Sequence, residues 1–263
     1  MEPVSVTQGS SPVILAQPHS GTWLPDNVRA ALNDEGLQLL DTDWRIPELY
    51  KWLVPEASIV RANFNRYAID ANRSPDGGNL YPGQNTTGLV PLTTFDAKPI
   101  WRVEPDEAEV ARRLDALHRP YHLALREQID RVRSAHGFAV LFDCHSIRSA
   151  IPYLFDGKLP DLNVGTNSGA SCSPQLERAV AETCAASPEF TSVLNGRFRG
   201  GWTTRHYGEP GANVHAVQME IAQSAYLESE APPFALATRK ADKLRALLAC
   251  VFDAIDNSLG DLT

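Results

Sequence analysis

The chain has 263 residues, a length that suits one large α/β domain or two small ones. Its 24 basic and 32 acidic side chains give a formal charge of −8, which argues against a nucleic-acid partner because phosphate recognition uses a basic surface. With 43% hydrophobic residues the chain can form a substantial core, and no apolar run reaches the ~20 residues that a membrane span needs.

The four cysteines, at positions 144, 172, 184 and 250, lie far apart and form no CxxC pair. This spacing favours reduced thiols over a disulfide framework or a thiolate zinc site. The first twelve residues contain neither the basic nor the apolar stretch of a secretory signal. We therefore expect a soluble, acidic, cytoplasmic protein that has neither a membrane nor a nucleic acid as its partner.

Four short apolar runs predict β-strands, and each run ends in polar residues. They cover residues 13–16, 58–60, 138–142 and 214–217. The first and third are almost continuously apolar, which is typical of strands covered on both faces of an α/β sheet. The second and fourth are more mixed.

The residues between these runs include helical patterns. From residue 107 to 133 apolar side chains recur at steps of three or four, the period of one helix face. Pro120 is expected to kink or divide this helix, and Gly137 to end it. Residues 174–186 and 235–256 predict two further helices. Alternating strands and helices predict a single α/β domain over residues 1–263, with a mixed, mostly parallel sheet flanked by helices.

Residues 74–100 are a long stretch rich in Gly, Pro, Asn and Thr, with few periodic apolar residues. A loop of this length in a compact domain is usually functional. We interpret it as a binding loop or as a lid that closes over a site.

The carboxyl ends of the predicted strands carry the residues of a metal-dependent hydrolase. Ligands of open α/β sheets bind outside these ends. His19 follows the first strand, His145 follows the third, and Glu220 lies at the end of the fourth. Imidazole and carboxylate groups suit zinc with an open position for water, and a further carboxylate can accept the proton of that water.

Each of these residues has a structural alternative. His19 and His145 would then be hydrogen-bonded residues at a turn or a strand end. Cys144 beside His145 suggests a cysteine hydrolase, but adjacent strand residues point to opposite faces, so we interpret Cys144 as a buried apolar residue. Glu220 lies among apolar residues, where a carboxylate needs a partner or a function.

His118 and His122 have the i, i+4 spacing of a zincin helix. The HEXXH motif requires a glutamate directly after the first histidine, and this chain has Arg119 there. We therefore assign structural roles to both histidines, and also to His136.

The segment 65–73 supplies two arginines, Arg66 and Arg73, for which a surface ion-pair loop is the structural alternative. Guanidinium groups bind carboxylates through two parallel hydrogen bonds. Two of them near a metal predict a small substrate with one or two carboxylates. Arg205, which follows a Gly-Gly pair, is a further candidate for such a pocket.

Six motifs together resemble the N-formylglutamate amidohydrolase family. They are PHSG (18–21), DTDW (41–44), NRYAIDANR (65–73), DCHS (143–146), GGWTTRHYG (200–208) and QMEIA (218–222). They occur in the order of the family, between residue 13 and about residue 226, and their combination is much more specific than any one of them. The resemblance implies a zinc-carboxypeptidase-like α/β fold, of the phosphorylase/hydrolase-like kind, distantly related to aspartoacylase.

The resemblance implies one divalent metal ion, with zinc as the first choice, bound by His19, His145 and an acidic residue. The carboxypeptidase pattern HxxE would place that acid at position 22, where this chain has Thr22. Asp43 is the candidate instead, with Asp41 as the alternative. The sequence does not separate the two, because both would share one face of an extended segment.

The resemblance also implies hydrolysis of N-formyl-L-glutamate to formate and L-glutamate, the final step of histidine degradation. Glu220 would be the general base. Arg73 would bind a substrate carboxylate or the oxyanion, while Arg66, Asn72 and Arg205 would orient the two carboxylates of this small N-acyl amino acid. The alternatives are a metalloamidase of the same fold acting on another N-acyl amino acid or a small peptide, and a non-catalytic carboxylate-binding protein.

Overall fold

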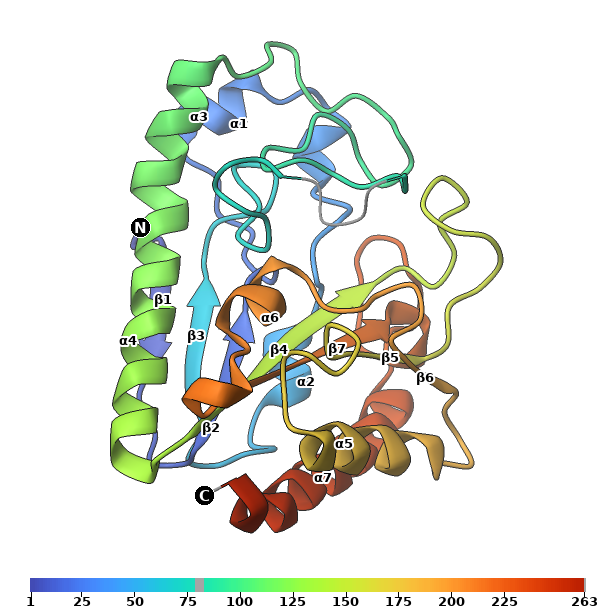
Figure 1. Cartoon of the computed structure of the whole chain (residues 1–263). Coiled ribbons are helices and arrows are strands. Elements are labelled where there is room, and N and C mark those ends of the chain that lie inside the picture. Colours follow the sequence, from blue (N-terminus) through green and yellow to red (C-terminus); the bar gives the residue numbers. More distant parts are fainter. Residues whose placement is uncertain (79–82, 263) are drawn as a thin grey trace.

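The computed structural model describes residues 1–78 and 83–262, in which seven strands form one sheet (Figure 1). The strands are β1 (Val4–Thr7), β2 (Val13–Gln17), β3 (Ser58–Ala62), β4 (Ala139–Ile147), β5 (Leu162–Gly165), β6 (Ser192–Leu194) and β7 (Val214–Ala222). Their spatial order is β1-β3-β2-β4-β7-β5-β6. The β1–β3 and β5–β7 pairs are antiparallel and the other four pairs are parallel. The predicted mixed, mostly parallel sheet is confirmed.

All four predicted apolar runs are strands. The runs at 138–142 and 214–217 are the beginnings of β4 and β7, which continue for nine residues each and are buried throughout. Both strands therefore carry their polar ends into the interior of the protein. The strands β1, β5 and β6 have only three or four residues and no apolar run that predicted them.

The three predicted helices are present, together with shorter ones. The helices are α1 (Asp26–Ala31), α2 (Ile46–Tyr50), α3 (Glu107–Arg113), α4 (Arg119–His136), α5 (Pro174–Ala185), α6 (Trp202–Tyr207) and α7 (Thr238–Ser258). A π-helical turn, η2 (Leu114–His118), divides α3 from α4 next to Pro120. Pro120 itself lies in the first turn of α4, where a missing N–H is tolerated. Gly137, at φ 83°, ends α4 by donating its N–H to the carbonyl of Arg133, as expected.

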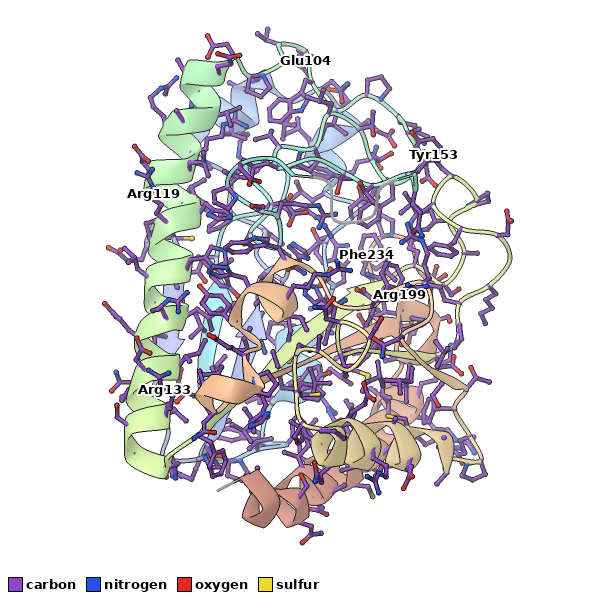
Figure 2. The ribbon with its side chains drawn as sticks, viewed as in Figure 1. Glu104, Arg119, Arg133, Tyr153, Arg199 and Phe234 are labelled. Carbon is purple, nitrogen blue, oxygen red and sulfur yellow. The ribbon has the colours of Figure 1, made fainter. Side chains whose placement is uncertain are left out.

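Helices cover both faces of the sheet. The α3–α4 pair and α6 lie over one face, and α2, α5 and α7 lie over the other (Figure 1). Exposed charged side chains of α4, such as Arg119, point away from the sheet (Figure 2). None of the helices in the described part of the chain is long and apolar enough to cross a bilayer.

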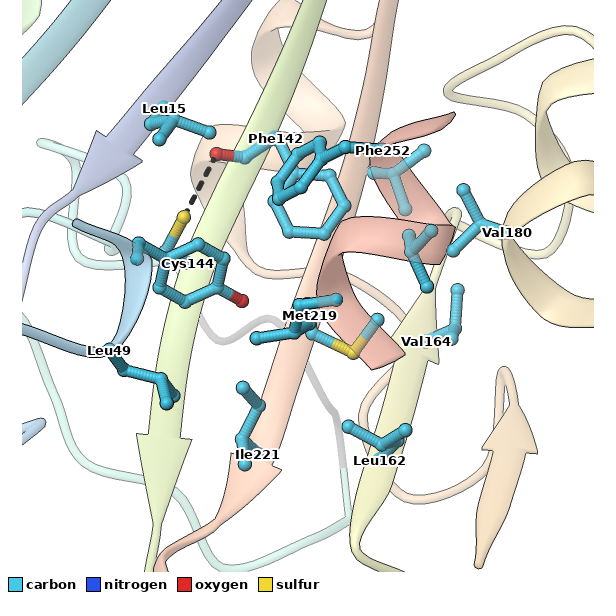
Figure 3. Packing of buried hydrophobic residues seen from close by; sticks show 14 of the residues in the cluster. Leu15, Leu49, Phe142, Cys144, Leu162, Val164, Val180, Met219, Ile221 and Phe252 are labelled. Atoms are coloured by element: carbon cyan, nitrogen blue, oxygen red, sulfur yellow. Dashed lines mark hydrogen bonds between the residues drawn. The ribbon is translucent and has the colours of Figure 1, made fainter. Parts of the chain in front are cut away.

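Alternate residues of the central strands belong to two separate hydrophobic clusters. Leu141 and Ala216 pack toward α4, whereas Phe142, Cys144 and Met219 pack toward α5 and α7 (Figure 3). Cys144 is therefore buried on the face opposite His145, with its thiol 3.5 Å from the carbonyl of Phe142, and the predicted apolar role is confirmed. The four cysteines are all free thiols.

The predicted loop at 74–100 contains no helix and no named strand in residues 74–78 and 83–100. Residues 79–82 of this loop lie outside the described residues. The described part contributes four residues, at positions 85–87 and 95, to the wall of a cavity at the carboxyl ends of β4 and β7.

Candidate active site

The register of β4 and β7 places polar side chains side by side at the carboxyl ends of these strands. His145 pairs with Glu220, and Asp143 pairs with Gln218. Paired residues of parallel strands point to the same face of a sheet, so all four side chains lie on the face that α4 and α6 cover. Because both strands are buried, these groups need partners inside the protein.

Three predicted metal ligands lie together. The ligand atoms of His19, Asp43 and His145 are all within 4.8 Å of one another. The Nδ1 atom of His145 is 3.1 Å from Oδ2 of Asp43, and Nδ1 of His19 is 3.8 Å from the same oxygen. The three side chains are almost completely buried. Residues far apart in the chain thus converge on one point.

Asp43, and not Asp41, faces the histidines. The backbone N–H of Asp43 donates to the carbonyl of His19 at 3.1 Å, which ties this turn to the end of β2. Oδ2 of Asp41 instead accepts hydrogen bonds from the Tyr67 hydroxyl and the Phe95 N–H, both at 2.8 Å. Burial raises the pKa of Asp41 to about 6. Asp41 therefore holds residues next to the cluster and is not itself one of the three converging ligands.

The other ring nitrogen of each histidine contacts a second carboxylate. Nε2 of His19 is 2.7 Å from Asp70, and Nε2 of His145 is 3.1 Å from Asp143. Histidines that bind metals commonly donate their second N–H to a carboxylate, which fixes the tautomer and the ring orientation. Here the contacts turn both Nδ1 atoms toward Asp43. Asp70 lies in the 65–73 motif between two arginines, but it was not among the predicted site residues.

The electrostatics of the cluster suit a cation. Burial and the charge of Arg66 lower the pKa of His19, which favours the neutral imidazole that a metal requires. Burial alone would lower the pKa of His145 too, but Asp143 and Asp43 raise it well above its usual value. Within the described part of the chain, Oδ1 of Asp43 has no hydrogen-bond partner, which is costly for a buried carboxylate. Two imidazole nitrogens and this carboxylate fit a divalent ion such as zinc.

Glu220 lines the same cavity on the strand next to His145. Its Oε2 accepts a hydrogen bond from Gln218 at 3.0 Å, and Gln218 in turn accepts one from the Gly201 N–H at 2.6 Å. Burial raises the pKa of Glu220 to about 8, while the charge of His145 opposes this rise and that of Asp43 adds to it. A carboxyl group that titrates near neutral pH can both accept and return a proton.

Arg66 and Arg73 both line the cavity, as expected of substrate-binding residues. Arg66 is buried, donates to Oδ2 of Asp70 at 2.7 Å and lies over the ring of Phe95. Arg73 donates through Nε and Nη2 to the carbonyl and the hydroxyl of Thr87, at 2.9 and 3.0 Å. The first arginine therefore compensates a buried carboxylate, and the second is attached to the long loop.

Asn72 also lines the cavity, and its amide group is fixed at both ends. Oδ1 accepts the backbone N–H of Thr203 at 2.8 Å, and Nδ2 lies 3.0 Å from Nε2 of His145. The backbone N–H of Asn72 donates to Asp70 at 2.8 Å. The amide thus connects the 65–73 segment to α6 and to the histidine cluster.

The three helix histidines contact backbone carbonyls. Nε2 of His122 is 2.9 Å from the carbonyl of Ala71, and Nε2 of His118 is 3.0 Å from that of Arg73. His136 contacts the carbonyl of Ser10 at 2.9 Å. Their predicted structural roles agree with these contacts, and the first two hold the segment that carries Asn72.

Arg205 is not among the described residues that line the cavity. Its Nε donates to the carbonyl of Gly200 at 2.8 Å, because α6 begins at Trp202 and turns this side chain back onto the Gly-Gly turn. Its role in orienting a substrate carboxylate stays a prediction. Arg197 lines the cavity instead. It lies in an irregular segment after β6 that none of the six motifs includes, so no sequence signal singled it out.

A mixed α/β sheet whose strand ends bring two histidines, an aspartate and a buried glutamate to one cavity is typical of metal-dependent hydrolases. The model of the N-formylglutamate amidohydrolase family matches residues 11–227. The chain belongs to this family, and the predicted family and hydrolase class are confirmed.

Relatives and solved structures agree with this assignment. An N-formylglutamate deformylase from Pseudomonas putida is 46% identical over 255 residues, which are 96% of this chain and 95% of that protein. Another from Pseudomonas aeruginosa is 44% identical over 257 residues, 97% and 96% of the two chains.

The fold is shared with an N-formylglutamate amidohydrolase from Ralstonia eutropha JMP134, at a TM-score of 0.81 and 23% identity, over 98% of this chain and 97% of that one. It is also shared with a gene product from Agrobacterium tumefaciens, at a TM-score of 0.75 and 19% identity, over 100% and 96%.

Proposed function

We propose that the protein hydrolyses N-formyl-L-glutamate to formate and L-glutamate, using one divalent metal ion held by His19, Asp43 and His145. The convergence of two Nδ1 atoms on Asp43, beside Glu220, carries the proposal. The two Pseudomonas relatives are named N-formylglutamate deformylases, which supports the substrate. Zinc is the proposed ion, because imidazole and carboxylate with an open position are its usual donors in hydrolases. We place the reaction at the end of histidine degradation, as the family resemblance implies.

Glu220 has the position of a general base, because it lines the cavity on the strand next to His145. A divalent ion at the cluster supplies Lewis acidity, which lowers the pKa of water and polarises a formyl oxygen. Glu220 accepts the proton of the attacking water and then delivers it to the leaving amine nitrogen. Gln218 holds Oε2 of Glu220, so the carboxyl group stays beside His145 during both proton transfers.

One substrate carboxylate is assigned to the 65–73 segment. Asn72 and Arg73 face the cavity and bind one carboxylate, and Arg73 is also suited to a developing oxyanion. Arg66 adds a buried positive charge whose direct partner is Asp70. Because formyl is the smallest acyl group, a closed pocket around it excludes larger acyl chains.

Two measurements on the purified protein test the proposal. Formate or acyl release is measured with N-formyl-L-glutamate and N-acetyl-L-glutamate, and bound metal is measured by elemental analysis. We expect formate release, bound zinc, and lower metal content in His19→Ala and His145→Ala. Glu220→Gln should keep the metal and lose roughly 10²–10⁴-fold in kcat. The exposed Glu228→Gln is the control and should behave as wild type.

Other outcomes favour the alternatives. Comparable rates on the N-acetyl substrate would indicate a broader N-acyl metalloamidase. Carboxylate binding without any turnover would indicate a non-catalytic binding protein. A normal kcat in Glu220→Gln would show that this carboxylate is not the base.

A further inference from the structure

Arg197 brings a guanidinium group to the same cavity from a part of the chain that the proposed mechanism does not use. Its Nε donates to the carbonyl of Leu154 at 3.2 Å, and its Nη2 donates to the carbonyl of Asn85 at 3.1 Å. These two acceptors come from different loops and are uncharged. They therefore orient the guanidinium group.

Arg73 and Arg197 are both attached to one short stretch of the long loop. Arg73 donates to the carbonyl of Thr87, and Arg197 donates to the carbonyl of Asn85, two residues earlier. Two residues of chain span at most about 7 Å, so the two guanidinium groups lie at neighbouring positions on the cavity wall. This arrangement suits a molecule with two carboxylates that a few methylene groups separate.

The two arginines are held by different parts of the cavity wall. Arg73 adjoins Asn72, whose amide is 3.0 Å from His145. Arg197 donates to the loops at residues 85 and 154, neither of which contributes a side chain to the histidine cluster. A carboxylate close to the scissile amide is therefore within reach of Arg73, and a carboxylate at the far end of the substrate is within reach of Arg197.

The surroundings of Arg197 favour the side chain of an acidic amino acid. Leu154 and Phe198 line the cavity beside it, and the Phe198 ring centroid is 5.3 Å from the guanidinium carbon. Both belong to a small apolar cluster with Ile147 and Ile151. Apolar walls pack against methylene groups, and they strengthen an ion pair by lowering the local dielectric.

We propose that Arg197 binds the side-chain carboxylate of the substrate and so selects acidic N-formyl amino acids over neutral ones of the same size. This inference rests on the proposed deformylase function. It assigns the α-carboxylate to Asn72 and Arg73, and it makes Arg197 a specificity-determining residue.

A pair of substrates that differ in one charge tests this role. The value of kcat/KM is measured with N-formyl-L-glutamate and N-formyl-L-glutamine for wild type, Arg197→Gln and Arg197→Lys. Arg197→Gln should lose roughly 10- to 100-fold on the glutamate substrate, the contribution of a charged hydrogen bond, mainly through KM. It should leave the glutamine substrate unchanged. Arg197→Lys should lose less, because it keeps the charge but not the paired hydrogen bonds.

Arg199→Gln is the matched control, since Arg199 lies two residues further along the same segment and is exposed. In Figure 2, Arg199 and Tyr153 are both labelled on the right side of the molecule. Arg199→Gln should not alter the preference between the two substrates.

Three results would overturn the inference or separate it from the proposed function. An equal loss on both substrates would show that Arg197 only ties the two loops together. No loss on either would show that it does not contact the substrate. If wild type releases formate from neither substrate, the proposed function fails. In that case calorimetry with L-glutamate and L-glutamine replaces the rates, and an Arg197→Gln variant that keeps the wild-type preference refutes the role of Arg197.

Discussion

Replacing Asp70 by Asn tests whether the carboxylates behind the histidines build the site. Asp70 is completely buried and accepts hydrogen bonds from three groups: Nε2 of His19 at 2.7 Å, Nη2 of Arg66 at 2.7 Å and the Asn72 N–H at 2.8 Å. Burial alone would raise the pKa of Asp70, but its contact with His19 and the charges of Arg66 and Arg73 hold it well below its usual value. The carboxylate is therefore ionised at neutral pH.

The expected losses of stability and of metal affinity depend on which contacts of Asp70 an Asn side chain can still make. Its Oδ1 can still accept from His19 and Asn72, but its NH₂ group would face the donor of Arg66. The buried guanidinium group would lose its close counter-charge, and its next carboxylate, Asp43, is 3.9 Å away. Breaking a buried ion pair from one side costs about 3–5 kcal/mol. Losing the carboxylate behind a metal-binding histidine costs about 10- to 100-fold in metal affinity.

Urea unfolding and metal titration measure the two effects. The control is Asp130→Asn, which removes an exposed Asp–Arg pair three residues apart on α4 and should cost less than about 1 kcal/mol. If Asp70→Asn unfolds with wild-type stability, the buried guanidinium group of Arg66 does not depend on Asp70 for compensation of its charge. Wild-type metal affinity would show that the Asp70–His19 contact does not support the ligand.

Two further expectations concern metal removal and pH. Removing the ion with a chelator should lower Tm, because His19, Asp43 and His145 come together only in the folded chain; an unchanged Tm after measured loss of the ion would contradict this site. Burial, with the charge of His118, holds the pKa of His122 well below 6.5. The unfolded chain therefore binds this proton more readily, and the free energy of unfolding should fall as pH drops below about 6.5. His122→Gln should weaken this dependence in urea unfolding, whereas the exposed His136→Gln should not; equal slopes in the two variants would refute the role of burial.

The strands were predictable where burial on both faces left a continuous apolar run. The runs at 13–16 and 138–142 are such cases, and they fix the centre of the sheet. The ends of β4 and β7 were not predicted as strand, because residues 143–147 and 218–222 contain polar groups, which are buried here. The strands β5 and β6 were missed because four and three residues carry too little pattern to distinguish a strand from a loop.

The candidate site was predictable up to the choices that depend on tertiary contacts. His19, His145 and Glu220 follow from strand ends that must meet in a parallel sheet. The choice between Asp41 and Asp43 depended on an irregular turn, in which Leu39 and Arg45 adopt positive φ values of 52° and 63°. Such a turn has no regular repeat of side-chain directions, so Asp41 and Asp43 do not point to the same side as they would in a strand.

The positions of Arg205 and Arg197 relative to the cavity could not be predicted from the sequence motifs either. Arg205 belongs to a motif of the family, but α6 directs it to the Gly200 carbonyl. Arg197 belongs to none of the six motifs, yet contacts with residues 85 and 154 bring it to the cavity. Cavity walls built from three separate loops depend on long-range contacts, which a local pattern does not encode.

At the proposed metal site, the charges around the two histidines suit a divalent ion better than a monovalent one. Arg66 offsets Asp70 at 2.7 Å, but it is 3.9 Å from Asp43. His145 lies between Asp43 and Asp143, with a ring nitrogen 3.1 Å from an oxygen of each. Both carboxylates are buried, and a buried charge needs compensation close by. A protonated imidazole or a monovalent ion offsets one of these two charges, whereas a divalent ion beside a neutral His145 offsets both.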